Sequence, residues 1–488
     1  MRSLERGSPL LRNWPAVVIL LAYLVVGSLY AVNTPVWQAP DEPAHYNYIR
    51  SLAEGEGIPV METGDYDQAY LERLTAERFP PGLPVDPLEY EDHQPPLYYF
   101  LTTPVYLISQ GSVVALRLTS LLLGGVAVAM VFLILREFWP SQPGIAWFGG
   151  GLVAFTPQYL AMMASVNNDA LVLALLWLWL WLALRYLRGK VSPWILGGVA
   201  GALLLAKTTG YGVLPLMGVV VYLRNRKAHL SGTRVVRQLV ALFVPALLLG
   251  GLWWGRNIVV YGWPDLLGLQ AHDRVVFGQP KTAAWIAEWG FVSFLRRALQ
   301  TTFRSFWGQF GWMGVVLDQR IYRGLLIFST LAIVGAVWRL VEAWRRGPDP
   351  RQRDALILLG MSAVITLAMY VGYNLVYVQH QGRYLFPALP LLVLGAALGW
   401  QHLLHQRQAV GMALALLLVT AGVGIVGALA GDPPLWTLAM LGAAAVGLPV
   451  LAFVPERYHG ALVALALVGM VVLDLWCLFG FIVPMLTA

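Results

Sequence analysis

Two adjacent carboxylates, Asp41 and Glu42, follow the first long apolar stretch of the chain and could perform acid–base chemistry. A carboxylate where a loop meets a helix can act as a general base that removes a proton from a reacting hydroxyl. Carboxylate oxygens also bind divalent cations. The run Pro40-Asp41-Glu42-Pro43 equally suits a helix start, because acidic side chains stabilise the N-terminal end of a helix. Both interpretations stay open.

Two histidines accompany these acids, and the candidate substrate-binding residues include Glu42, His45, His93 and the later Asn168. His45 follows them by about one helical turn, and His93 comes some fifty residues later, directly before a Gln-Pro-Pro run. His93 could bind a metal or a substrate, and Asp41, Glu42 and His93 form a candidate site for a divalent cation if the intervening chain folds back. The alternative for His93 is an ordinary surface histidine.

A second acid and a lysine stand at the edges of later apolar runs. Asn168 and Asp169 begin one run, where they could face a cavity or cap a helix. Lys207 interrupts another run in a chain that has 4 lysines and 29 arginines, so lysine is not the default cation here. A fixed positive charge at Lys207 suits a phosphate. The alternative is a lysine that extends its ammonium to the lipid headgroups.

Arginines add further candidate phosphate contacts. Arg383 is followed by Tyr384 and preceded by His380, which adds polarity at the same point. Arginine matches phosphate oxygens through two parallel hydrogen bonds, whereas an arginine beside a tyrosine can also mark the membrane interface. Arg256 is a third candidate cation for a phosphate.

Membrane helices must position these residues. The 488-residue chain is 58% hydrophobic and only 12% charged, whereas a soluble globular protein carries about 25% charge. Apolar runs close to the roughly 20 residues that cross a bilayer recur along the chain, and backbone groups in lipid must be paired within helices. The composition therefore predicts an all-α polytopic membrane protein. The net charge of +7 fits arginine-rich cytoplasmic loops and requires no nucleic acid.

Charge patterning predicts about 13 crossings, with the N-terminus in the cytoplasm. Arg2, Arg6 and Arg12 precede the first apolar run, and positive residues stay inside. Four arginine-rich segments are predicted inside as well, at 185–190, 224–237, 344–353 and 402–408. This arrangement places on the outside the segments 165–170, 256–320 and 378–384 and the region around Lys207. The unusual polar groups therefore converge on the outer side, and ionisable groups at membrane depth are usually functional.

A long outside loop is expected at 33–112. Its part from Asn33 to Gln94 holds 13 of the 26 acidic residues and only three arginines. Segments 41–54 and 65–79 are predicted as amphipathic helices that lie on the membrane. Segment 93–111 is short and contains three prolines, so it is predicted not to cross the bilayer fully.

The order of these motifs resembles the GT-C superfamily of integral-membrane glycosyltransferases, and is most similar to bacterial relatives of protein O-mannosyltransferases and lipid A aminoarabinose transferases. The motifs are an early DE pair, HQPPLYY, NNDAL, LLLAKTTGYGVLPL and GRYLFPALPLL. The stretch TPVWQAPDEPAH is similar to a bacterial branch with a PDEPAH signature. The resemblance implies a GT-C-like catalytic module over residues 1–400, followed by transmembrane helices of unknown role over 401–488.

The resemblance also implies a reaction. A sugar would pass from a polyprenyl-phosphate carrier to a hydroxyl of a glycan, lipid or protein on the outer face of a bacterial inner membrane. Asp41 matches the catalytic base, Asp169 the acid of the second motif, and Lys207, Arg383 and Tyr384 the expected contacts of the donor phosphate. Direct displacement assisted by one base predicts inversion at the anomeric carbon, and a divalent metal ion is a candidate cofactor.

Two other classes of function fit parts of the pattern. A transporter or flippase of lipid-linked saccharides needs polar groups along a path between the two sides, whereas the charges here gather mainly at one interface. No internal repeat is evident, which weakens the inverted-repeat transporter interpretation. A polysaccharide polymerase or ligase would share the outside arginines but lack the early DE pair.

Overall fold

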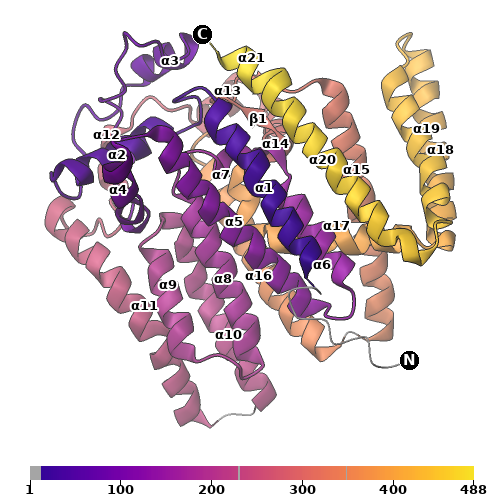
Figure 1. Cartoon of the computed structure of the whole chain (residues 1–488), viewed down its shortest axis with the longest axis horizontal. Helices are drawn as coiled ribbons and strands as arrows, with labels where there is room; N and C mark the ends of the chain where they lie inside the picture. Colours follow the sequence, from indigo (N-terminus) through magenta and orange to yellow (C-terminus); the bar gives the residue numbers. More distant parts are fainter. Residues whose placement is uncertain (1–12, 229–230, 348, 488) are drawn as a thin grey trace.

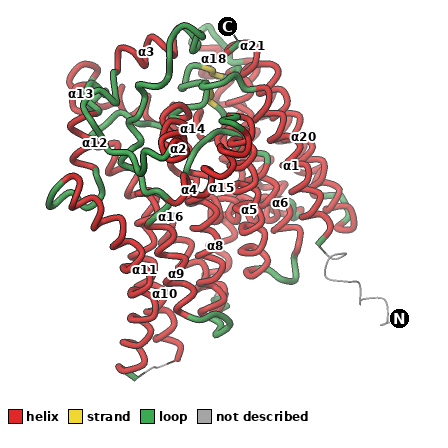
Figure 2. Tube along the Cα trace, turned by 60° about the vertical axis from the view of Figure 1, so that its left-hand side comes forward, coloured by secondary structure: helices red, strands yellow, loops and turns green. Residues whose placement is uncertain are grey.

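Long helices make up most of the computed structural model, which describes residues 13–228, 231–347 and 349–487 (Figures 1 and 2). The N-terminal arginines Arg2, Arg6 and Arg12, on which the orientation prediction drew, lie outside these residues. Ten helical stretches in the described part are long and apolar enough to cross a membrane, so the chain is a multi-pass membrane protein. They are α1 (Trp14–Asn33), α5 (Val113–Phe138), α8 (Asp169–Leu187), α11 (Gly232–Tyr261), α15 (Gln319–Arg346), α16 (Pro350–Asn374), η2 with α17 (Gly382–Ala388 and Leu389–Leu403), α18 (Gln406–Leu429), α19 (Leu435–Ala452), and η3, α20, η4 and α21 (Glu456–Tyr458, His459–Trp476, Cys477–Ile482 and Val483–Leu486).

Three shorter helices lie between the long stretches along the chain. These are α6 (Pro143–Ala154), α9 (Pro193–Leu204) and α10 (Val213–Ala228). The described residues thus hold ten candidate membrane spans, and the figure of about 13 crossings stays a prediction.

Short elements gather at one end of the bundle, opposite the C-terminal end of α10 and the start of α11 (Figure 1). They are α2 (Glu42–Glu54), α3 (Gln68–Ala76), α4 (Leu97–Ser109), α7 (Pro157–Met163), η1 (Thr208–Gly212), α12 (Leu269–Val275), α13 (Thr282–Trp289), α14 (Phe291–Trp307), β1 (Gln309–Phe310) and β2 (Val315–Val316). The predicted amphipathic helices at 41–54 and 65–79 correspond to α2 and α3. The 13 residues of α4 rise about 20 Å, which is too short to cross the roughly 30 Å of hydrocarbon.

The packing of α2 against α4 fixes the first loop over the bundle. Pro43 lies in the first turn of α2, where its missing N–H costs nothing. Gly55 ends the helix in a left-handed conformation, with φ of 85°. Between these ends, the ring of Tyr48 stacks on that of Tyr99 in α4, with centroids 3.6 Å apart. The N-terminal end of α2 is thereby held against the membrane helices.

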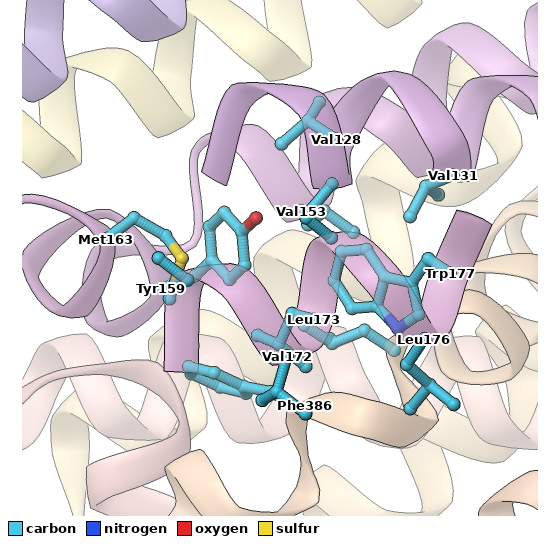
Figure 3. Packing of buried hydrophobic residues seen from close by; sticks show 14 of the residues in the cluster. Val128, Val131, Val153, Tyr159, Met163, Val172, Leu173, Leu176, Trp177 and Phe386 are labelled. Carbon is cyan, nitrogen blue, oxygen red and sulfur yellow. The ribbon is translucent and has the colours of Figure 1, made fainter. Parts of the chain in front are cut away.

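The main apolar core lies directly beneath this end, where α5, α6, α7, α8 and η2 meet (Figure 3). Tyr159 of α7 packs on Trp177 of α8 and on Phe386 of η2, with ring centroids 6.1 and 5.8 Å apart. Its hydroxyl donates to the carbonyl of Gly124 in α5 at 2.9 Å. This core therefore sets the positions of α7, the start of α8 and η2 relative to one another.

The C-terminal helices do not form one separate unit. Helices α18 and α19 pack together over a small apolar cluster that includes Leu416, Leu441 and Leu448. Helix α20 instead returns to the N-terminal part of the bundle (Figure 1), where the Tyr30 hydroxyl donates to the carbonyl of Asp474 at 2.8 Å. The division between residues 1–400 and 401–488 stays a prediction.

Candidate active site

A strained turn between α1 and α2 presents Asp41. Asp41 has a left-handed backbone, with φ of 68°, and its side chain makes no capping hydrogen bond to α2. Such a conformation costs a non-glycine residue about 1 kcal/mol or more and persists only where its surroundings impose it. Here the Trp37 N–H donates to Glu42 Oε2 at 3.0 Å, and Trp312 Nε1 donates to the Trp37 carbonyl at 2.9 Å. The turn thus directs the Asp41 carboxylate away from helix capping.

Asp41 pairs with an arginine from the far end of the sequence. Arg383 Nη2 donates to Asp41 Oδ2 at 2.6 Å, and the Tyr90 hydroxyl donates to Oδ1 at 3.2 Å. The Arg383 side chain is 5% exposed, whereas that of Asp41 is 23% exposed. Burial is the largest single influence and raises the pKa of Asp41. The charge of Arg383, its hydrogen bond and the charge of Lys207 act against burial, and the net effect lowers the pKa. Asp41 is therefore ionised and still accessible.

A second ion pair joins two helix breaks. Lys207 Nζ donates to Asp169 Oδ1 at 2.6 Å, and both side chains are partly exposed. Asp169 begins α8, where its N–H donates to Asn167 Oδ1 at 2.8 Å, so Asn167 supplies the cap. Lys207 stands between α9 and η1 in an extended conformation. The break in each helix lets a charged side chain face the same end of the bundle as Asp41.

The two ion pairs act on each other. The charges of Arg383 and Lys207 both lower the pKa of Asp41, besides the opposing effect of burial. We refer to Asp41, Asp169, Lys207 and Arg383 as the charge cluster. The charge cluster brings together acids and cations from four sequence motifs that lie between residues 41 and 383. The side chains of Asp41, Asp169 and Lys207 are partly exposed, so a ligand can reach them.

His45 lies beside the charge cluster and is neutral. Burial, followed by the charge of Lys207, lowers the pKa of His45 to about 3. Its Nδ1 is 2.9 Å from the Tyr99 hydroxyl, which Asn168 Nδ2 also approaches, at 3.5 Å. The predicted substrate-binding residues His45 and Asn168 are thus joined through Tyr99 in a buried polar layer below the charges.

Glu91 belongs to the same region and was missed by the sequence analysis. Burial, followed by the charge of Asp41, raises the pKa of Glu91 to about 8. Asp41 and Glu91 therefore differ in ionisation at neutral pH, as in sites where two carboxyl groups take separate roles. The available signal was the acidic pair Glu91-Asp92 directly before the HQPP motif, but composition alone could not separate it from the other acids of this loop.

Glu42 was predicted to bind substrate, and its contacts correct that prediction. Arg117 donates to it through Nε and Nη2, both at 2.7 Å, and the Val166 N–H donates to Oε1 at 3.1 Å. The other N–H groups of Arg117 donate to backbone carbonyls of Ala31, Thr34 and Pro35. Both side chains are almost fully buried, at 0% and 1% exposure. Glu42 therefore joins α2, α5 and the loop before α8, and leaves nothing free for a ligand.

The candidate metal site made of Asp41, Glu42 and His93 does not form. In the ranges that the structure describes, no three His, Cys, Asp or Glu side chains are placed to hold a metal ion together. Glu42 is saturated by Arg117, while His93 Nδ1 contacts the Tyr90 carbonyl at 3.1 Å and its ring packs on His272. His93 also does not enter the charge cluster, because its other nitrogen contacts Gln94.

Arg256 is likewise engaged elsewhere. Its guanidinium donates to the Pro59 carbonyl and, at 3.0 Å, to Asn257 Oδ1, and it lies over the rings of Trp253 and Tyr261. Arg256 thus ties the first loop to α11 and does not serve the charge cluster as the predicted third phosphate contact.

His380 and Tyr384 flank Arg383 in different ways. The His380 ring packs against Phe294, with centroids 5.1 Å apart, and lies in an aromatic layer. Tyr384 stays near the charges, since its ring centroid is 5.3 Å from Arg383 Cζ.

Gly382 holds the start of η2 against α14, because its N–H donates to Ser305 Oγ at 2.7 Å. A Cβ there would lie 2.3 Å from the nitrogen of Phe306, so the close approach of η2 to α14 requires glycine.

Comparisons with known proteins identify the family and the fold. Residues 95–392 match the family model described as "Predicted membrane protein (DUF2142)". A search of curated proteins by sequence found no match. Two solved structures of ArnT from Cupriavidus metallidurans are similar to the whole chain. The one bound to undecaprenyl phosphate aligns with a TM-score of 0.52 and 16% identity, over 97% of this chain and 77% of that one.

The ArnT structure in the apo state aligns comparably, with a TM-score of 0.51 and 15% identity over 98% of this chain and 77% of the other. ArnT is a GT-C glycosyltransferase. The chain therefore has the GT-C fold that its motifs predicted.

Proposed function

The chain belongs to the DUF2142 family of membrane proteins, and we propose that it transfers a sugar from a polyprenyl-phosphate-linked donor to an acceptor hydroxyl. The observation that carries this proposal is the 2.6 Å ion pair between Asp41 and Arg383, beside the pair of Asp169 and Lys207. It joins an ionised, accessible carboxylate to cations that a phosphate requires. The fold supports the proposal, since the ArnT structure named above was solved with undecaprenyl phosphate.

Asp41 would act as the general base. Its carboxylate accepts the proton of the acceptor hydroxyl as the hydroxyl oxygen forms a bond to the anomeric carbon. The bond from that carbon to the phosphate oxygen breaks, and polyprenyl phosphate leaves with the bonding electrons. Attack from the face opposite the phosphate inverts the anomeric carbon. The lowered pKa of Asp41 keeps the carboxylate ionised before the reaction.

Arg383 and Lys207 would stabilise the departing phosphate. Lys207 has three N–H donors, and one of them is used by Asp169. Arg383 donates to Asp41 through Nη2, and its Nε has no partner among the described residues. Both cations can therefore hold their acids and contact phosphate oxygens as well, where negative charge grows in the transition state. Tyr384 would border the same phosphate.

The active site would face the outside of a bacterial inner membrane. Asp41 directly precedes α2, which lies at the end of the bundle opposite the start of α11 (Figure 1). Arg234 and Arg237 lie in the first turns of α11. Arginine-rich loops stay in the cytoplasm. A Glu54→Cys variant would test this orientation, because Glu54 is exposed in the first loop and the native Cys477 is buried. A membrane-impermeant maleimide should label intact spheroplasts, and labelling only after lysis would reverse the assignment.

The reaction is tested by Asp41→Asn. Purified protein in lipid nanodiscs is supplied with radiolabelled undecaprenyl-phosphate sugars and a membrane extract as acceptor. Loss of a general base should lower transfer roughly 10²–10⁴-fold. Glu54→Gln removes an exposed acid from the same loop and should leave transfer unchanged. Near-normal turnover by Asp41→Asn would remove Asp41 from this role, and mass spectrometry of the copurified lipid would identify the sugar.

A further inference from the structure

Buried polar atoms without partners surround the charge cluster. Besides Arg383 Nε, which the proposed function assigns to the phosphate, three such atoms of the described residues come from three separate segments: His45 Nε2, Glu91 Oε2 and Asn168 Oδ1. Native proteins satisfy 90% or more of their buried polar groups, so each exception calls for a missing partner such as water or ligand. The charges of Asp41, Lys207 and Arg383 act on both His45 and Glu91, so a polar molecule bound at the charge cluster could supply the missing partners.

The unpartnered atoms include both donors and acceptors. Asn168 Oδ1 can only accept, whereas the Glu91 carboxyl group can also donate when it is protonated. An anion would satisfy the donors and repel the acceptors, whereas a hydroxyl group both donates and accepts. Several hydroxyls on one ligand would therefore suit this set of atoms better than a second phosphate would.

No ion pair in the described part of the chain engages Glu91, whereas Asp41 and Asp169 each pair with a cation. Arg383 is paired with Asp41 and Lys207 with Asp169. The titratable and charged groups that act on Glu91 or are acted on by it are Asp41, Tyr90, Asp92, Tyr99, Lys207, Tyr373 and Arg383. Burial and the charge of Asp41 outweigh the opposing charges of Lys207 and Arg383, so Glu91 is held as a neutral carboxylic acid beside the ionised Asp41.

A neutral carboxylic acid selects a particular chemistry. It offers one O–H donor and keeps acceptor capacity on both oxygens. It does not attract a metal ion or a substrate cation, and it does not repel the phosphate held by the neighbouring cations. The region around the charge cluster is thus divided into a charged part, built from Arg383 and Lys207, and a neutral part built from Glu91, His45 and Asn168.

We propose that Glu91 is a specificity-determining residue whose neutral carboxyl group hydrogen-bonds a hydroxyl of the sugar on the donor lipid. This inference rests on the proposed function. It identifies Glu91 as the part of the site that recognises the uncharged sugar. Its place beside Asp41 puts the recognised hydroxyl next to the reacting centre, while the phosphate stays with Arg383 and Lys207.

The test compares lipids that differ only in the sugar. The full chain in nanodiscs is titrated with undecaprenyl phosphate, undecaprenyl-phosphate glucose and undecaprenyl-phosphate mannose. Wild type should bind at least one glycosylated lipid about tenfold more tightly than the bare lipid, which corresponds to one good hydrogen bond. Glu91→Leu should abolish that difference. Glu91→Gln, which is neutral and still donates and accepts, should keep most of it.

Three controls separate the possible outcomes. All variants should bind bare undecaprenyl phosphate within about twofold of wild type, which also reports that they are folded, and Glu91→Ala replaces Glu91→Leu if the larger residue prevents folding. Glu54→Leu removes an exposed acid and should change no affinity. A wild-type protein without sugar preference, or a Glu91→Leu or Glu91→Ala variant that retains it, overturns the role of Glu91. Failure of wild type to bind the bare lipid would instead overturn the proposed function.

Discussion

Asp41 and Glu42 are neighbours in sequence, and the structure gives them opposite surroundings. The Glu42 carboxylate receives hydrogen bonds from Arg117 and from the N–H groups of Trp37 and Val166, and it is fully buried. The Asp41 carboxylate holds one arginine nitrogen and one tyrosine hydroxyl and is 23% exposed. Both acids face an arginine, so the presence of an ion pair does not separate a structural acid from a reactive one.

The difference lies in how completely each arginine is used. All the N–H groups of Arg117 have acceptors on Glu42 or the backbone. Arg383 keeps one buried N–H without a partner in the described part of the chain. A saturated pair stabilises the fold, whereas a pair with an unused N–H and a partly exposed carboxylate can also bind a ligand. The following substitutions would sharpen or break this comparison.

Arg117→Met should have the largest effect, and this effect should be a loss of folding stability. It leaves the Glu42 carboxylate buried without its partner, which typically costs about 3–5 kcal/mol. Thermal and denaturant unfolding of the purified protein in detergent would measure the loss. Arg407→Met removes an exposed arginine and should change stability little, and the double variant with Glu42→Gln should recover part of the loss. A loss below about 1 kcal/mol would show that the buried pair is not the structural anchor of the first loop.

Lys207→Met should have the second-largest effect, and this effect should be on the rate of sugar transfer. Charge-assisted hydrogen bonds contribute about 1.5–3 kcal/mol, so transfer from a polyprenyl-phosphate sugar should fall roughly 10–100-fold. Stability should change less than in Arg117→Met, because the ion pair of Lys207 is partly exposed. Initial rates at several donor concentrations would measure the effect, and Lys190→Met is the matched control because Lys190 is exposed. If Lys207→Met lost stability and kept its rate, Lys207 would belong with Arg117.

A pH profile should show a smaller effect that separates Asp41 from Glu91. The pKa of Asp41 is lowered, so its base form is present throughout the neutral range. The pKa of Glu91 is raised to about 8, so its acid form is present below that pH and is lost above it. Sugar transfer should therefore fall on the alkaline side, by about tenfold between pH 8 and pH 9.5. The Glu91→Gln side chain cannot ionise, so this variant should not show the fall. If the variant kept the wild-type profile, the alkaline loss of activity would not come from Glu91.

The architecture was largely predictable because lipid imposes it. Apolar length and arginine placement determined the helices, and the acidic segment with its proline-rich end predicted α2, α3 and the short α4. The helix breaks at Asp169 and Lys207 were visible as polar residues inside apolar runs. These features are local, so a single sequence suffices to read them.

The partners of each charge were not predictable in the same way. Nothing local distinguishes Glu42 from Asp41, since the difference depends on Arg117, which is 75 residues away from Glu42. A lone arginine within an apolar run was an available signal for a buried ion pair. Arg256 seemed a phosphate contact for the same reason that Arg383 did, and only tertiary contacts place one on the first loop and the other beside Asp41.

Arg256→Met should have the smallest effect. It tests whether an arginine that is bonded to the first loop without a carboxylate partner acts only in structure. Arg256 resembles Arg117 in donating to a backbone carbonyl of the first loop, at Pro59, but it holds no carboxylate. Its removal therefore strands no buried charge and should cost about 1 kcal/mol of stability, the typical net value of a hydrogen bond. The rate of sugar transfer should stay within about twofold of wild type in the same nanodisc assay. Arg256→Met could instead lower sugar transfer as much as Lys207→Met while keeping normal stability. That result would assign Arg256 to the phosphate site and show that hydrogen bonds to a loop do not exclude a role in binding.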